Sequence, residues 1–100
     1  MNRDEIMAAV YEAIARANEL RDPGAQIALD PATALFGAGG ALDSLGLVSL
    51  VLDVEDAVNG ATGRAVTLSD DRAMSQARSP FRTVSSFVDY IGERLRGPDM

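Results

Sequence analysis

The stretch GGALDSLGLVSLVLDVEDAV, residues 39–58, places a serine at the expected start of an unusually apolar helix. Seven of the ten residues from Leu45 to Val54 are apolar, which is more than a helix with one buried face needs. At 3.6 residues per turn, the helix has two distinct faces. The first is wholly apolar and is assigned to the core: Leu47, Leu50, Val51, Val54 and Val58. The second mixes apolar, polar and acidic residues: Leu45, Val48, Ser49, Leu52, Glu55 and Asp56.

The mixed face has two interpretations. Apolar side chains that stay exposed within a ring of acids are typical of a protein-binding surface. Alternatively, the bundle buries both faces of the helix, and the mixed face has no partner. Periodicity alone does not separate these interpretations.

Apolar spacing along the rest of the chain predicts an all-α fold in a single domain covering residues 1–100. The expected helices cover residues 3–20, 44–59, 69–77 and 83–96. The loop from 21 to 43 contains two prolines and four glycines, which argue against a continuous helix there. The fold class is therefore a four-helix bundle, with three main helices, a short third helix and a long loop between the first two.

Local signals define the helix ends and the anchors of the long loop. Asn2 and Glu5 form a capping box for the first helix, and Thr83 caps the last one. Because Asp43 can itself cap the second helix, we expect Ser44 at the first helical position, pointing outward. Four apolar residues are expected to anchor the loop to the bundle: Ile27, Leu29, Leu35 and Phe36.

The composition excludes most chemistry that the chain might perform alone. It has no cysteine, histidine or lysine, so it offers no thiolate metal site, no Ser-His-Asp triad and no Schiff-base amine. We therefore expect no catalytic residue and no metal site, and a chain that takes part in catalysis only as a substrate or carrier. A small hydrolase built on carboxylates such as Asp53 and Asp56 is disfavoured, because nothing indicates a cleft between them.

The negative charge is concentrated around the serine. The net charge is −6, and between Arg21 and Arg64 the chain holds six acids and no base. Such a field repels nucleic acids and attracts partners with basic surfaces. Because no signal peptide or membrane-spanning run is apparent, we expect a cytoplasmic protein without a membrane span.

The stretch LFGAGGALDSLGLVSLVLDVEDAV resembles the signature of acyl carrier proteins. The tripeptide Asp43-Ser44-Leu45 is weak evidence alone, but its context strengthens it. The similarity covers nearly the whole chain: the first helix, the long loop with ALFG, the apolar helix with acids, and the final TVSSFVDYI.

The resemblance implies a non-enzymatic carrier with the four-helix fold of that family. Ser44 would receive 4′-phosphopantetheine from coenzyme A, and the thiol of this arm would carry acyl groups as thioesters. Asp43 would help to engage the phosphopantetheinyl transferase and its magnesium. Leu45, Val48, Leu52, Glu55 and Asp56 would form the docking face for an acyl-loading ligase or transferase and for downstream enzymes with basic surfaces. We expect such a carrier to be a monomer.

Two features depart from the fatty-acid-synthesis form of the family. Gly46 and Ser49 stand where acids are common, and the segment 69–82 is longer than usual. These departures suggest a stand-alone carrier in a specialised pathway, fatty-acid-like, polyketide-like or other. An aminoacyl or peptidyl carrier remains an alternative, as does a degenerate helical bundle that acts only as a protein-interaction module.

Overall fold

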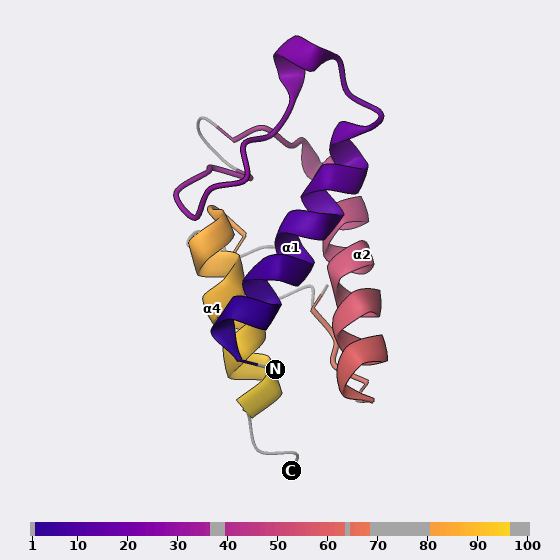
Figure 1. The fold of residues 1–100 in the computed structure, drawn as a ribbon, viewed down its shortest axis with the longest axis vertical. Coiled ribbons are helices and arrows are strands. Elements are labelled where there is room, and N and C mark those ends of the chain that lie inside the picture. Colours follow the sequence, from indigo (N-terminus) through magenta and orange to yellow (C-terminus); the bar gives the residue numbers. More distant parts are fainter. Residues whose placement is uncertain (1, 37–39, 64, 69–80, 97–100) are drawn as a thin grey trace.

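The computed structural model describes residues 2–36, 40–63, 65–68 and 81–96, and Figure 1 shows their arrangement. These ranges contain three α-helices: α1 (Arg3–Asn18), α2 (Ser44–Thr62) and α4 (Val84–Arg96). A short 3₁₀ helix, η1 (Pro23–Ala25), lies in the long loop. No strand occurs within them, so this part of the chain is all-helical, as predicted. The predicted helix over 69–77 lies outside the described residues.

The start of α1 is the capping box predicted from Asn2 and Glu5. The N–H of Glu5 donates to Oδ1 of Asn2, and the N–H of Asn2 donates to Oε1 of Glu5, each at 2.8 Å. The helix ends at Asn18 rather than at residue 20, because the N–H groups that follow donate three residues back instead of four. The Asn18 side chain then bonds both the N–H and the carbonyl of Ile27, at 2.8 and 3.0 Å, which fixes the loop against the helix.

The end of α2 was predicted at residue 59, and this prediction is wrong, since the helix continues to Thr62. The Asn59 side chain does not compete with the helix, because it bonds the N–H and carbonyl of Val66, at 2.8 and 3.1 Å. The helix ends where Gly63 adopts a left-handed backbone conformation (φ 72°) and donates its N–H to the carbonyl of Asn59 at 2.9 Å.

The start of α4 agrees with the predicted cap. Oγ1 of Thr83 accepts from the N–H of Ser86 at 3.1 Å, and Oγ of Ser86 accepts from the N–H of Thr83 at 3.0 Å. This reciprocal pair satisfies donors that the first turn of a helix leaves free. The predicted boundaries of 83–96 are therefore confirmed to within one residue.

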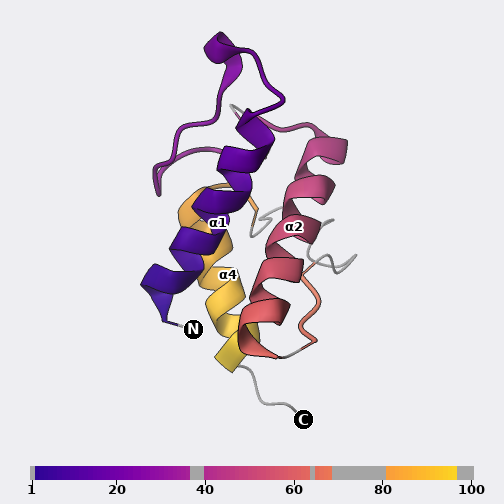
Figure 2. The same ribbon diagram turned by 45° about the vertical axis from the view of Figure 1, so that its right-hand side comes forward.

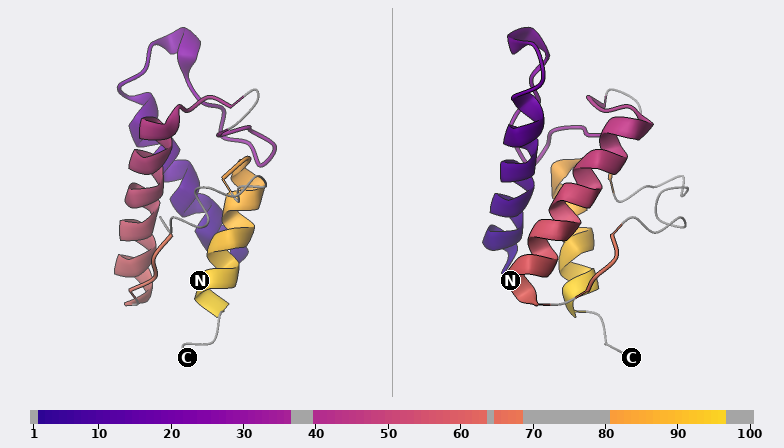
Figure 3. Two further views of the ribbon diagram at one scale, coloured as in Figure 1. Left: turned by 180° about the vertical axis from the view of Figure 1, so that it is seen from behind. Right: turned by 90° about the vertical axis from the view of Figure 1, so that its right-hand side faces the viewer.

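The helix α1 packs against both other α-helices, α2 and α4. Both of these run in the direction opposite to α1 (Figures 1 and 2). The long loop crosses one end of the molecule and brings the chain to the start of α2, as the view from behind in Figure 3 shows. Within the described residues, no helix combines the length and apolar character needed to cross a membrane.

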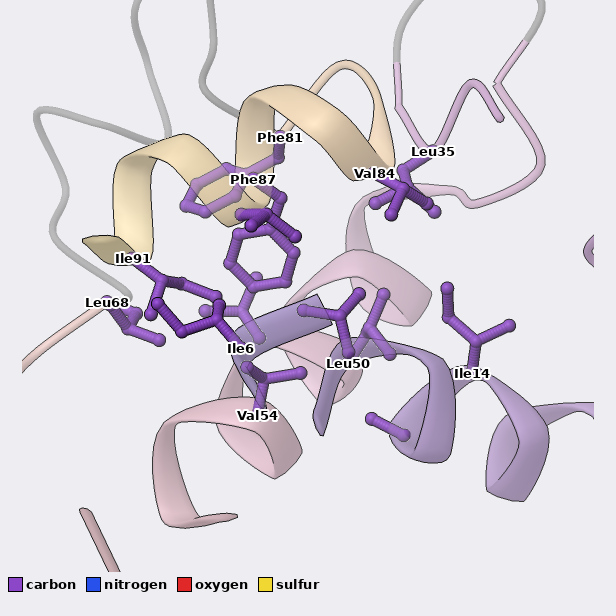
Figure 4. Close-up of a cluster of buried hydrophobic side chains, with 14 of the residues drawn as sticks. Ile6, Ile14, Leu35, Leu50, Val54, Leu68, Phe81, Val84, Phe87 and Ile91 are labelled. Carbon is purple, nitrogen blue, oxygen red and sulfur yellow. The ribbon is translucent and has the colours of Figure 1, made fainter. Parts of the chain in front are cut away.

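Among the described residues, the core draws on the three α-helices and on the loops (Figure 4). The face of α2 assigned to the core is wholly buried, and Phe81 packs edge-on against Phe87 with ring centroids 5.3 Å apart. Of the predicted loop anchors, Ile27 and Leu35 are buried, and Phe36 packs on the core from the edge. The anchor predicted at Leu29 is wrong: Leu29 is 51% exposed and lies in a run of exposed loop residues, 28–32.

Candidate functional site

Asp43 forms the start of α2. Its backbone is extended, and its Oδ1 accepts a hydrogen bond from the N–H of Gly46 at 2.7 Å. The prediction that Asp43 caps the helix is confirmed, and Ser44 is the first residue of α2. The predicted outward direction of the Ser44 side chain lies outside what the structure describes. The backbone of Ser44 thus lies at the helix end whose dipole and N–H groups favour an anion.

Backbone hydrogen bonds between three segments hold the approach to Ser44. The N–H of Leu42 donates to the carbonyl of Leu35 at 2.9 Å, and the N–H of Leu35 donates to the carbonyl of Arg82 at 2.7 Å. Ala34 and Thr83 form an isolated antiparallel bridge in the same place. The chain that leads into α2 is therefore fixed to the chain that leads into α4.

The first turn of α4 adds two further bonds to this loop. The N–H of Val84 donates to the carbonyl of Thr33 at 3.0 Å, and the N–H of Ser85 donates to the carbonyl of Pro31 at 2.9 Å. Donors that the helix leaves free are thus satisfied by the loop. The loop is long, but this part of it is firmly positioned.

Two glycines near Ser44 permit close backbone packing. A Cβ on Gly40 would lie 2.7 Å from Cα of Phe36, so only glycine lets the chain return over that residue. A Cβ on Gly46 would lie 3.1 Å from Oδ1 of Asp43 and 3.3 Å from Cδ2 of Leu42. The residue that follows the Asp-Ser-Leu tripeptide is therefore crowded by the capping carboxylate and by Leu42.

The predicted docking face of α2 is open to solvent at its apolar residues. Leu45 is 77% exposed, Leu52 is 48% exposed, and Val48 between them is half-buried. Asp56 is exposed beside them. Burial of both faces of α2, the alternative that periodicity left open, does not occur at Leu45 or Leu52.

Glu55 differs from the other residues predicted for this face. It is half-buried, and its Oε2 accepts a hydrogen bond from the N–H of Leu68 at 2.8 Å. Leu68 is itself fully buried in the core. Glu55 therefore has a structural contact that its helical position did not indicate.

A groove of about 360 Å³ lies between α1 and α2, beside the first turns of α2. Its floor includes Leu42 and the buried Leu50. The wall on the α1 side is formed by Arg16, Ala17, Leu20 and Arg21. The wall on the α2 side is formed by Gly46, Ser49 and Asp53. Ser49, predicted for the mixed face, therefore borders this groove on the side of α1.

Sequence analysis did not identify this groove or its two arginines. From the sequence pattern, Arg16 is only a basic residue in the last turn of α1, and Arg21 only a residue that follows the end of that helix. Their position beside α2 depends on how α1 packs against α2, which local patterns do not encode. One available signal was that Arg21 is the last basic residue before the acidic stretch around Ser44.

The described residues contain no cluster of three or more acidic side chains that could hold a metal ion. Comparison of the chain with protein-family models, with curated proteins and with solved structures gives no match.

Proposed function

We propose that the chain is a carrier protein of the acyl carrier type, with 4′-phosphopantetheine attached to Ser44. The observation that carries the proposal is the hydrogen bond from the N–H of Gly46 to Oδ1 of Asp43. Because Asp43 serves as the cap, Ser44 has no capping role to explain its presence at the start of α2. The four-helix bundle of the carrier family, with the segment 69–77 as its short helix, is part of the same proposal.

The residues around Ser44 fit the prosthetic group. A phosphodiester on Ser44 would lie at the N-terminal end of α2, where backbone N–H groups and the helix dipole favour negative charge. Asp43 is exposed, so a modifying enzyme can reach it. The chain has no cysteine and therefore no thiol of its own. When bound, the arm supplies a thiol that forms thioesters.

The attachment reaction needs no catalytic residue from this chain. The Ser44 hydroxyl oxygen bonds to the phosphorus that carries pantetheine in coenzyme A. The bond from that phosphorus to the oxygen of adenosine 3′,5′-bisphosphate breaks, and this group leaves. The serine proton passes to a base of the transferase, which also supplies the magnesium. A chain without histidine or lysine suits the role of acceptor substrate.

The outer face of α2 suits partners with basic surfaces. The exposed leucines Leu45 and Leu52 provide apolar contact area next to Ser44, and the exposed Asp56 adds negative charge. Apolar anchors within a charged rim are the usual composition of a protein interface. Val48 also contributes to this docking face. Glu55 contributes negative charge to it while one of its carboxylate oxygens, Oε2, accepts the hydrogen bond from Leu68.

The proposed cargo is an acyl group of a specialised pathway. Gly46 and Ser49 leave the first turns of α2 without the acids common in carriers of fatty-acid synthesis. An aminoacyl or peptidyl cargo is the alternative within the family, and loading assays with adenylating enzymes separate the two. The alternative outside the family is a helical bundle that only binds other proteins. The exposed leucines on α2 are the one observation that favours it.

The test is the intact mass of the folded chain after incubation with coenzyme A, magnesium and a promiscuous phosphopantetheinyl transferase. The wild type is expected to gain one phosphopantetheine, and Ser44→Ala none. Ser49→Ala is the matched control, because Ser49 is an exposed serine on the same helix. Equal modification of Ser44→Ala and wild type would contradict the assigned site.

A further inference from the structure

The groove between α1 and α2 opens beside the residue that the proposed function assigns to the prosthetic arm. On α2, its lining residues Gly46, Ser49, Leu50 and Asp53 follow the spacing i, i+3, i+4, i+7, which is one stripe of a helix. At 1.5 Å per residue, this stripe extends about 10 Å along α2 from a point two residues after Ser44. The groove therefore starts within one helical turn of Ser44 and leads away from it along α1. Because residues two apart on a helix point to opposite sides, the arm reaches the groove around the N-terminal end of α2.

The chemical character of the groove changes along its length. Near Ser44 the α2 side is neutral, with Gly46, Ser49 and Leu50, and its one charged residue, Asp53, lies at the far end. The opposite wall carries apolar contact area from Leu20, which is 93% exposed. An occupant that extends from Ser44 thus passes the capping carboxylate of Asp43 beside Gly46 and then meets Ser49 and Leu50, with no further acid of the lining before Asp53.

Arg21 supplies a positive charge at the end of the groove nearest Ser44. Its Nη2 donates to the carbonyl of Ala41 at 3.4 Å, and its Nε donates to the carbonyl of Ala25 at 2.6 Å. Ala41 precedes Ser44 by three residues, so their backbones are at most about 11 Å apart. A guanidinium has five N–H donors, and these two bonds leave donors for an anion.

Arg21 forms no ion pair with a carboxylate among the described residues, although the stretch that follows it is acidic. A second arginine, Arg16, lines the same wall and is bonded to Glu12 on its own helix at 3.3 Å. The groove therefore offers the guanidinium of Arg21, which has no carboxylate partner among the described residues, next to apolar surface. This combination suits a chain that has a phosphate at one end and methyl and amide groups beyond it.

We infer that the groove between α1 and α2 holds the phosphopantetheine arm on Ser44, with Arg21 facing its phosphodiester and Leu20, Leu42 and Leu50 facing its methyl groups. The inference rests on the proposed function and adds a resting place for the arm on this chain. It places the arm on the side of α2 that faces α1, away from the exposed Leu45 and Leu52. Those leucines stay available to partner enzymes while the arm is at rest.

The experiment is NMR of the isotopically labelled chain after modification, with attachment first verified by mass. The expected result is nuclear Overhauser contacts from the two methyl groups of the arm to Leu20, Leu42 and Leu50. The Arg21→Gln variant is expected to lose these contacts, and Arg94→Gln to keep them, since Arg94 is exposed on α4 and far along the chain from the groove. Raising the salt concentration on the wild type is expected to weaken them, because salt screens the contact between guanidinium and phosphodiester.

The outcomes separate the two proposals. A modified chain whose arm contacts Leu45 or Leu52, or contacts no side chain of the groove, would overturn the inference and leave the proposed function standing. Contacts that persist unchanged in Arg21→Gln and in high salt would overturn the role of Arg21. A folded chain that gains no phosphopantetheine would overturn the proposed function and this inference with it.

Discussion

The carboxylate of Asp43 stabilises the fold through one hydrogen bond, from the N–H of Gly46 at 2.7 Å. The proposed function gives the same side chain a second role, in engaging the transferase. These roles can be separated, because asparagine is also a good helix cap but carries no charge. Residue 43 therefore allows the structural and functional parts of the account to be tested independently.

At Asp43, we expect Asp43→Ala to lower the free energy of unfolding by about 1 kcal/mol, because the first turn of α2 loses its cap. Asp43→Asn is expected to retain most of the stability while slowing modification of Ser44. Urea denaturation and the rate of phosphopantetheine attachment are the two measurements. A loss of both stability and rate in Asp43→Asn would argue that the charge is needed for the fold.

At Gly46, the gain expected from a better helix former is reduced by close contacts. Gly46→Ala places a Cβ 3.1 Å from Oδ1 of Asp43, whereas a Cβ on Gly60 meets nothing within 4 Å. Both glycines lie within α2, so Gly60→Ala is expected to stabilise the chain by about 0.5–1 kcal/mol. Gly46→Ala is expected to gain clearly less in the same urea titration. Equal gains would show that Asp43 and Leu42 adjust without cost.

At the scale of elements, α2 is stabilised by bonds from its sides as well as by its ends. Asn59 bonds the backbone of Val66, and Glu55 bonds the N–H of Leu68. Both contacts attach the segment that follows Gly63 to the helix it has just left. The face of α2 that carries Glu55 is therefore partly a structural surface.

We expect Glu55→Ala to destabilise the chain by about 1–3 kcal/mol, because the N–H of Leu68 loses its acceptor next to the buried core. Asp56→Ala is the matched control, since Asp56 is exposed on the next position of α2. The control is expected to change the stability by less than about 0.5 kcal/mol. Thermal or urea unfolding measures both, and equal stabilities of the two variants would contradict the structural role of Glu55.

The predictions from sequence succeeded where local signals decide the structure. Each observed helix cap joins atoms no more than three residues apart, so short sequence patterns predicted it. These caps are formed by Asn2 with Glu5, by Asp43 and by Thr83. Contacts between segments further apart along the chain could not be predicted from such patterns. The bond of Asn59 to Val66 prolongs α2 past a predicted stop, and the position of Arg21 beside the groove depends on the packing of α1 against α2.

At the scale of the whole molecule, the long loop belongs to the core. Leu35 is fully buried, and its N–H and carbonyl join the segment before α4 to the segment before α2. Its neighbours in the core come from several helices, as Figure 4 illustrates. The position of Ser44 therefore depends on the integrity of the core as well as on the cap.

We expect Leu35→Ala to cost about 2–5 kcal/mol of stability, because it leaves a cavity in a closely packed core. Leu29→Ala makes the same chemical change in the same loop but at a side chain that is half exposed. It is expected to cost less than about 1 kcal/mol. Denaturant unfolding of the two variants measures the difference, and equal losses would contradict the loop packing described above.

The measurement that tests the central claim most directly is fragment mass spectrometry of the wild-type chain after treatment with coenzyme A, magnesium and a promiscuous transferase. Trypsin leaves residues 22–64 as one peptide, because no basic residue lies between Arg21 and Arg64. The account predicts a single phosphopantetheine on this peptide, located at Ser44 by fragmentation. A folded chain without the modification, or with it on another residue such as Ser49, would contradict the account.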